Sequence, residues 1–448
     1  MNACIEQAAT VRRRLQMHRA LRTARSRSLA FVTRVSAALL LGALAPAMLL
    51  ARLLGARVAS ERRSGQRGQF FNVYTLVKRN GQPLPVAANW PRLLNVARGE
   101  VCWVGPEAKQ PAAVDFKLEQ SRRIAAVKPG LVCSWWVRQR TNVAYATQAE
   151  TDFQYVDSHS LKADLGIGAR ALLAMAYGRP GNDFTEQTTI LGLPLDNLTL
   201  AQAAEEIVRP ATTTRQVSFV NVDCVNVSCR DTEYRLILRS SALRLADGIG
   251  LRVAGKLLRS EVRQNVNGTD LFPVLCTLMA ERGLSIYLLG GRPGVAEDVA
   301  ARVSASNPGL KIAGTRNGYF AASEEAAVIA EINASGADVL LVAFGAPLQE
   351  KWIRRNQHRL RVRSALGVGG LFDFYSGRTP RAPQWLRELG LEWSFRLYQE
   401  PGRMWRRYLL GNVVFLTRVM AAKFFGAYRS PDGNQRALPV LPTGQSST

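Results

Sequence analysis

The feature that most constrains the fold is an alternation of strand-like and helical segments between residues 188 and 385. The strand-like runs are VSFVNV, LSIYLLGG, LKIAGTRNGYF and ADVLLVAFG, the helical ones are VAEDVAARVSAS and EEAAVIAEINAS, and SALGVGGLFDF closes the series. Such alternation is typical of a parallel sheet with helices on both faces. The sequence therefore predicts a Rossmann-like α/β domain over residues 188–385.

The beginning of the chain indicates contact with a membrane. Residues 1–34 contain eight arginines and one acid, a net charge of 8 − 1 = +7, and an uncharged apolar run follows over 35–51. The run is slightly short for a span of about 20 residues, contains Pro46, and is flanked by arginines on both sides. We expect a helix at 35–54 that either re-enters one leaflet by turning at Pro46 or spans the bilayer. The long basic leader argues against a signal peptide.

Composition narrows the class of protein. A chain of 448 residues with 47% hydrophobic residues has room for two or three packed domains and is not globally disordered. Its 59 Lys and Arg against 34 Asp and Glu predict an anionic partner, which could be nucleic acid, phospholipid or a phosphorylated substrate. Six cysteines without a CxxC pair and only three histidines argue against a disulfide framework and a zinc site.

These features divide the chain into six segments. A smaller mixed α/β domain is expected at 55–180, joined to the Rossmann-like domain by a polar linker at 178–189. A basic, aromatic appendage follows at 386–429, and the Pro/Gly/Ser-rich tail at 430–448 is expected to be disordered.

Several polar residues stand where an α/β sheet binds ligands. Asp247 in LADGIG is either a general base or a turn residue that caps the backbone. Gly290 and Gly291 follow a strand, where they could receive a phosphate or only form a tight turn. The candidate binding residues elsewhere are Asn267, Thr269, Asp270, Gln349 and Lys351, with Thr269 or Asp270 as an alternative helix cap. No Asp-x-Asp pair occurs, so we expect chemistry without a metal, in which protein cations stabilise a leaving diphosphate.

The appendage offers such cations. Arg396, Arg403 and Arg407 recur at a spacing that places them on one face of a helix, with Arg406 beside them and aromatic residues between. This pattern favours a membrane-surface element, and an ordinary solvated basic helix is the alternative. No nucleic-acid-binding module is recognised.

The motifs ILGLPLDNLTLAQA, FVNVDCVN, ADGIG, NGTDL, YLLGGRPGVAE, GAPLQEKW and GLEWSFRLYQEPGRMWRRY follow one another over residues 190–410. In this order they resemble the WecG/TagA/CpsF family of bacterial glycosyltransferases. The resemblance implies transfer of a sugar from a UDP-sugar to a polyprenyl-diphosphate-linked sugar, with no cofactor. It also implies that Asp247 is the general base, that Asn221 and Gln349 hold a sugar, and that the appendage arginines contact diphosphate and membrane. Phe219 stands where some members have Thr.

Residues 27–178 resemble the bacterial sugar transferases that move a hexose-1-phosphate onto undecaprenyl phosphate, through ERRSGQRGQFFNVYTLVK, WPRLLNVARGEVCWVGPE and VKPGLVCSWWVRQR. The acidic nucleophile pair of that family is replaced by Ala88 and Asn89, and its phosphate-binding Arg by Glu107. We therefore expect a silent domain kept as a membrane anchor or acceptor platform.

The two resemblances together predict an enzyme on the cytoplasmic face of the bacterial inner membrane, acting in exopolysaccharide assembly. Its expected partners are a UDP-sugar, an undecaprenyl-diphosphate-linked sugar and anionic lipid, with self-association left open. A bifunctional enzyme and a non-enzymatic scaffold for lipid-linked intermediates are the alternatives.

Overall fold

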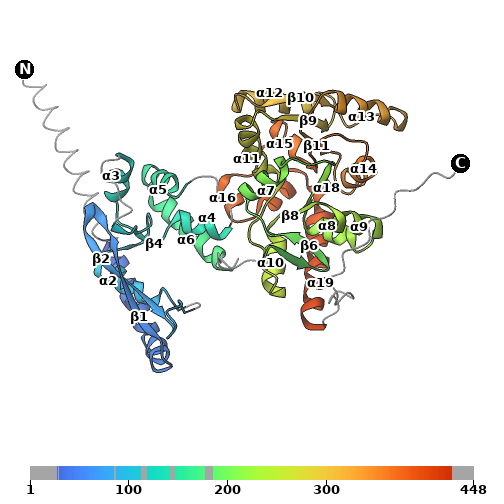
Figure 1. Cartoon of the computed structure of the whole chain (residues 1–448). Coiled ribbons are helices and arrows are strands. Elements are labelled where there is room, and N and C mark those ends of the chain that lie inside the picture. The colour runs from blue at the N-terminus through green and yellow to red at the C-terminus, as the bar shows by residue number, and fades with distance from the viewer. Residues whose placement is uncertain are drawn as a thin grey trace, which may run out of the picture. The chain divides into compact units, whose positions relative to one another are not determined.

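The computed structural model describes Ser28 and residues 30–84, 87–111, 119–141, 147–176 and 185–425 (Figure 1). The predicted tail at 430–448, residues 1–27 of the basic segment and residues 178–184 of the predicted linker lie outside the described residues. The chain divides into two compact units, Met1–Ala176 and Tyr177–Thr448, which are described separately below.

The N-terminal unit begins with a single apolar helix, Ala30–Leu53, which is long and apolar enough to cross a membrane. The helix is continuous and includes Pro46. A proline inside a helix removes one backbone hydrogen bond, and the bonds on either side of it keep the helical path. Ala37 packs against Phe71, Val73 and Val101 of the same unit, while most of the helix is exposed.

The rest of this unit is a small mixed α/β body. Its strands are β1 (Arg57–Ser64) and β2 (Phe70–Val77), an antiparallel hairpin, and β3 (Cys102–Val104) and β4 (Gly130–Val132), a parallel pair. Its helices are α2 (Leu93–Arg98), α3 (Glu119–Ala125), α4 (Ser134–Thr141), α5 (Gln148–Asp157) and α6 (Leu161–Ala176). Helices α4, α5 and α6 enclose a second small core around Val137, Tyr155 and Ile167.

The second unit contains the predicted parallel sheet, with strands in the order β10-β9-β11-β12-β7-β8. The strands are β7 (Arg215–Val220), β8 (Leu243–Ala246), β9 (Ser285–Gly290), β10 (Lys311–Arg316), β11 (Val339–Ala343) and β12 (Ser364–Gly367), and a separate hairpin joins β5 (Gln187–Ile190) to β6 (Leu193–Asp196). Every pairing in the six-stranded sheet is parallel. The Rossmann-like prediction is therefore confirmed.

Helices cover both faces of this sheet. They are α7 (Leu200–Val208), α8 (Val222–Ser228), α9 (Thr232–Ser240), α10 (Ile249–Leu258), α11 (Gly268–Glu281), α12 (Val295–Ser306), α13 (Glu325–Ala334), α14 (Leu348–Asn356) and α15 (Leu371–Tyr375). Ile286 and Leu288 of β9 join the core beneath α7, α11 and α12, whereas Tyr287 and Leu289 join the core beneath α13 and α14. This division follows from the alternation of side chains along a strand.

The appendage is not the single helix that the arginine spacing predicted. It consists of α16 (Gln384–Glu388), α17 (Glu392–Gln399), α18 (Pro401–Trp405), a π-helical turn (Arg406–Leu410) and α19 (Gly411–Phe425). Glu400 leaves the helical conformation because a residue before proline is disfavoured in it. Residues Pro401–Phe425 form a second segment that is long and apolar enough to cross a membrane, with Phe415 and Val419 packed into the core.

Candidate functional site

Asn221 and Asp247 lie next to each other at the carboxyl edge of the sheet. They follow β7 and β8, whose last residues Val220 and Ala246 are register partners. The backbone N–H of Asp247 donates to the carbonyl of Val220 at 2.7 Å, and the side-chain amide of Asn221 donates to the Asp247 carboxylate at 3.4 Å. Open α/β sheets bind their ligands outside this edge.

A cavity of about 140 Å³ opens at this edge. Besides Asn221 and Asp247, it is lined by three groups of residues: the start of α11, the loops after β11 and β12, and the appendage arginines. The groups contribute Asn267, Gly268 and Thr269; Gly345, Ala346, Gln349, Gly369 and Gly370; and Arg396, Arg403 and Arg407. The structure thus brings together eight of the predicted site residues: Asn221, Asp247, Asn267, Thr269, Gln349, Arg396, Arg403 and Arg407.

The environment of Asp247 suits a general base. Burial raises the pKa of its carboxyl group to about 6, while the hydrogen bond from Asn221 and the positive charge of Arg407 lower it. A group with this pKa is mostly ionised at neutral pH and still accepts a proton readily. Its side chain points to Asn221, and Gly248 occupies the N-cap position of α10.

Three arginines place positive charge in the cavity although they come from separate helical segments. Arg407 pairs with Asp223 at 3.2 Å, Arg396 lies over the Phe374 ring at 5.0 Å, and Arg403 pairs with Glu400 at 2.9 Å. An anionic ligand in this cavity would face all three guanidinium groups.

The start of α11 adds a further electropositive element. Asn267 caps this helix by accepting from the backbone N–H of Asp270 at 2.8 Å, so the predicted alternative caps Thr269 and Asp270 are not the cap. Gly268 and Thr269 begin the helix at the cavity wall, where the N-terminal dipole favours negative charge. Asp270 is buried beside the cavity and pairs with Arg381 at 2.5 Å.

The remaining predicted residues lie elsewhere. Lys351 pairs with Asp231 at 2.7 Å and with Glu233 at 2.6 Å. Arg406 is exposed and stacks on Trp405 at 5.4 Å. A side chain at Gly290 would lie 2.7 Å from the backbone of Ala343, so close packing of β9 on β11 accounts for that glycine. Gly291 is similarly crowded by Val295, and none of these four residues lines the cavity.

Two residues that contact the cavity arginines, Asp223 and Phe374, were not predicted from the sequence. Asp223 lies two residues after Asn221, at the start of α8, and holds Arg407. Phe374 of α15 supports Arg396 from within the closing motif GLFDF. Asp223 stands in FVNVDCVN and Phe374 in SALGVGGLFDF, and only their three-dimensional neighbours distinguish them from the other residues of these motifs.

Clusters of metal-ligating side chains were sought among the described residues. Among those residues, no group of three or more His, Cys, Asp or Glu side chains is arranged to hold an ion. The basic side chains in the described lining of the cavity are Arg396, Arg403 and Arg407.

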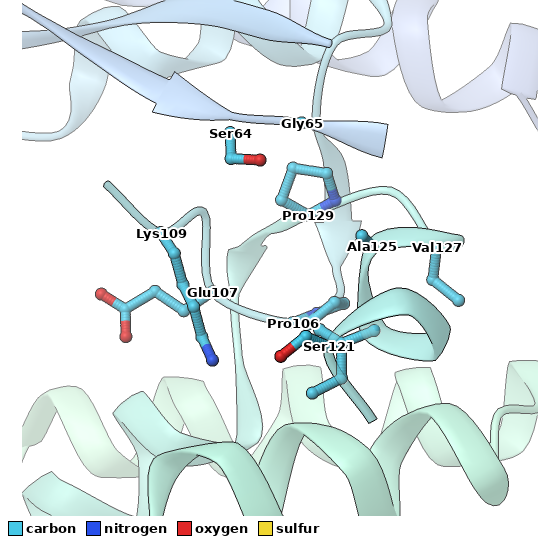
Figure 2. A pocket seen from close by; sticks show the side chains of 10 residues that line it. Ser64, Gly65, Pro106, Glu107, Lys109, Ser121, Ala125, Val127 and Pro129 are labelled. Carbon is cyan, nitrogen blue, oxygen red and sulfur yellow. The ribbon is translucent and has the colours of Figure 1, made fainter. Parts of the chain in front are cut away.

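Described residues of the N-terminal unit line two further cavities. The smaller one has a volume of about 30 Å³ (Figure 2). Ser64 and Gly65, at the end of β1, line one side of it, and the loop that carries Glu107 and Lys109 lines another. The other, of about 110 Å³, is lined by Arg63, Arg92 and Glu107 among others, and Glu107 is the one carboxylate of its described lining. The Glu107 carboxylate accepts from the Gln148 side-chain amide at 2.6 Å. In the described lining of each cavity, Glu107 is the one carboxylate.

A carboxylate, three arginines and a helix N-terminus share one cavity at the carboxyl edge of a parallel sheet, an arrangement suited to an anionic ligand such as a phosphorylated one. Residues 188–429, more than half of the chain, match the sequence model of the glycosyl transferase WecG/TagA/CpsF family. The chain belongs to this family and is a glycosyltransferase. Residues 88–178 match the bacterial sugar transferase family.

Two curated relatives are N-acetylglucosaminyldiphosphoundecaprenol N-acetyl-beta-D-mannosaminyltransferases. That of Bacillus subtilis strain 168 is 34% identical over 193 residues, which are 43% of this chain and 74% of the relative. That of Bacillus spizizenii is 34% identical over 180 residues, which are 40% of this chain and 69% of the relative.

Proposed function

We propose that the C-terminal unit transfers a sugar from a UDP-sugar to a sugar carried on undecaprenyl diphosphate, with Asp247 as the general base. The observation that carries the proposal is the placement of this carboxylate opposite three arginines in one cavity. The two relatives are named for an N-acetylglucosaminyldiphosphoundecaprenol acceptor and for the N-acetyl-beta-D-mannosaminyl group that they transfer. UDP-N-acetylmannosamine is therefore the first donor to test.

In the proposed reaction Asp247 accepts the proton of the attacking hydroxyl group of the acceptor sugar. The acceptor oxygen forms a bond to the anomeric carbon of the donor, and the bond from that carbon to the diphosphate oxygen breaks. UDP leaves with the bonding electrons. Arg396, Arg403, Arg407 and the N-terminus of α11 stabilise the negative charge that develops on it.

We further propose that the N-terminal unit is catalytically silent and serves as an anchor at the cytoplasmic face of the inner membrane. The exposed apolar helix Ala30–Leu53 supports the anchor. Ala88 and Asn89 cannot act as an acidic nucleophile, and the larger cavity nearby offers one carboxylate among its described residues.

The deciding experiment measures UDP release by the purified full-length protein in detergent, with a panel of UDP-sugars, the lipid-linked acceptor and EDTA. We expect acceptor-dependent UDP release with one donor and its loss in Asp247→Asn. The matched control is Asp298→Asn, which removes an exposed carboxylate paired with Arg378 away from the cavity. Release of UMP with magnesium and undecaprenyl phosphate, and no UDP release with any donor, would overturn both proposals.

A further inference from the structure

Gln349 joins the two loops that form the floor of the cavity. Its side-chain oxygen accepts from the backbone N–H of Gly345 at 3.1 Å and from that of Gly369 at 2.9 Å. These glycines follow β11 and β12, which are neighbours in the sheet. Only one orientation of the amide works, because a flipped amide would turn its NH₂ group toward two N–H donors.

The neighbouring residue selects that orientation. The NH₂ group of Gln349 donates to Oε1 of Glu350 at 2.7 Å. Glu350 is 1% exposed, and its other oxygen, Oε2, has no hydrogen-bond partner among the described residues. A carboxyl group buried with so little compensation is costly for stability, which favours a role in arranging the site.

Contacts on two sides keep the pair in place. A Cβ atom added at Gly367, the last residue of β12, would lie 2.8 Å from Nε2 of Gln349 and 2.9 Å from Oε1 of Glu350. The side-chain amide of Gln216 in β7 donates to the backbone carbonyl of Glu350 at 3.1 Å. The backbone of β12 and the side chain from β7 thus hold the start of α14 against the sheet.

The held loop also lies against a cation of the cavity. A Cβ atom at Gly370 would lie 2.9 Å from a guanidinium nitrogen of Arg396, so the loop that Gln349 fixes through Gly369 sits directly beside this arginine. A shift of this loop would displace Arg396 relative to Asp247. Glu350 itself does not line the cavity.

We propose that Glu350 is a positioning residue, whose buried Oε1 fixes the Gln349 amide so that it clamps the loops after β11 and β12 beneath the substrate. This inference deepens the proposed function and rests on it for the kinetic part of its test only. What the clamp requires of Glu350 is an acceptor oxygen, and a negative charge is not required.

The test compares Glu350→Gln, which keeps an acceptor oxygen, with Glu350→Met, which has none. Backbone hydrogen exchange of full-length protein is followed in peptides that cover residues 344–347 and 368–371. We expect faster exchange in both peptides for Glu350→Met and near wild-type exchange for Glu350→Gln. The kcat/KM for UDP release should fall about 10- to 100-fold in Glu350→Met, as for other small misplacements of a site, and should be largely retained in Glu350→Gln.

Asn356→Leu is the control for general destabilisation, because Asn356 is a buried polar residue of the same helix away from the cavity. The Gln349→Met variant provides a second test of the same inference. In the double variant, Glu350→Met should add little to the effect that Gln349→Met has alone. Unchanged exchange in Glu350→Met, or equal damage in Glu350→Gln and Glu350→Met, would overturn the inference. Hydrogen exchange is measured without substrate. An inactive wild-type protein would therefore count against the proposed function, while the comparison of exchange between Glu350→Met and Glu350→Gln would still test the positioning role of Glu350.

Discussion

The side chain of Asn221 serves two neighbours at once: its oxygen accepts from the backbone N–H of Cys224 at 3.0 Å, and its NH₂ group donates to Asp247 at 3.4 Å. The first contact caps α8, and the second lowers the pKa of the Asp247 carboxyl group. The local stability of a helix and the basicity of the proposed catalytic group therefore depend on one residue.

Asn221→Ser should separate these two effects. Serine is a good N-cap but lacks the amide donor, so the unfolding free energy should stay close to wild type while the pKa of Asp247 rises above about 6. Activity needs the ionised base, so the acid limb of the kcat/KM profile should move to higher pH. Asn221→Ala should show the same shift and lose about 1 kcal/mol of stability. Superimposable profiles for Asn221→Ser and wild type would refute this assignment.

Arg407→Gln should also move the acid limb to higher pH. The positive charge of Arg407 is one of the influences that lower the pKa of Asp247, and its removal makes the carboxylate easier to protonate. The measurement is kcat/KM for UDP release as a function of pH. Arg406→Gln is the matched control, because Arg406 stacks on Trp405 outside the cavity; a shift of equal size in both variants would contradict the prediction.

Asp152→Asn should stabilise the N-terminal unit at neutral pH. Burial raises the pKa of Asp152 from 3.8 to about 7, against the charge of Lys109. The folded state therefore binds the proton more tightly than the unfolded state, and stability falls as pH rises from about 4 to about 7. The stability of the variant should not fall over this pH range. At pH 8 its free energy of unfolding should exceed that of the wild type by at most about 4 kcal/mol, at 1.36 kcal/mol per pKa unit. Thermal unfolding at pH 5 and pH 8 checks this, with exposed Asp157→Asn as the control; equal shifts at the two pH values would contradict it.

Replacing Leu39 and Leu50 together by arginine should weaken membrane attachment. Both side chains are exposed on the N-terminal helix, at 71% and 57%. An arginine in an apolar membrane segment costs roughly 3 kcal/mol. The check is sedimentation with membranes after a carbonate wash, where the double variant should appear in the supernatant more than the wild type. Leu236→Arg, at an exposed site on α9, should sediment with the membranes as the wild type does. If this control were released to the same extent as the double variant, the prediction that the N-terminal helix attaches the protein to the membrane would be wrong.

The sheet could be predicted because strands buried on both faces are nearly continuous apolar runs. β8 was harder to recognise, because it has only four residues and includes Arg244, whose charge is balanced by Asp196 at 3.1 Å. That ion pair joins residues far apart in the chain and leaves no local signal.

Proline shows why breaks in helices were predicted less well. Pro46 lies within a helix that continues through it, whereas Pro401 begins a new helix after Glu400 has left the helical conformation. Proline is tolerated at the first helical position, whereas inside a helix it removes one backbone hydrogen bond and favours a kink or a break. The exposed Pro46 lies inside a continuous helix all the same, so a proline in the sequence does not by itself mark the end of a helix.

The motifs identified the right loops but not the direction of every side chain. Gln349 and Lys351 are two residues apart on α14, a rotation of about 200° around the helix. The first therefore faces the cavity while the second meets Asp231 and Glu233. Arg406 and Arg407 are consecutive residues of the π-helical turn and point in different directions, and of the two only Arg407 lines the cavity.

The arginines of the cavity come from a part of the chain that is synthesised after every strand of the sheet. During translation, a domain can begin to fold before the residues that follow it are made. A nascent chain that ends after β12 contains Asn221, Asp247 and every strand of the sheet, yet it lacks Arg396, Arg403 and Arg407. A prematurely terminated product of this kind would carry the proposed base without the cavity arginines, so the ribosome must pass residue 407 before the proposed site can be complete.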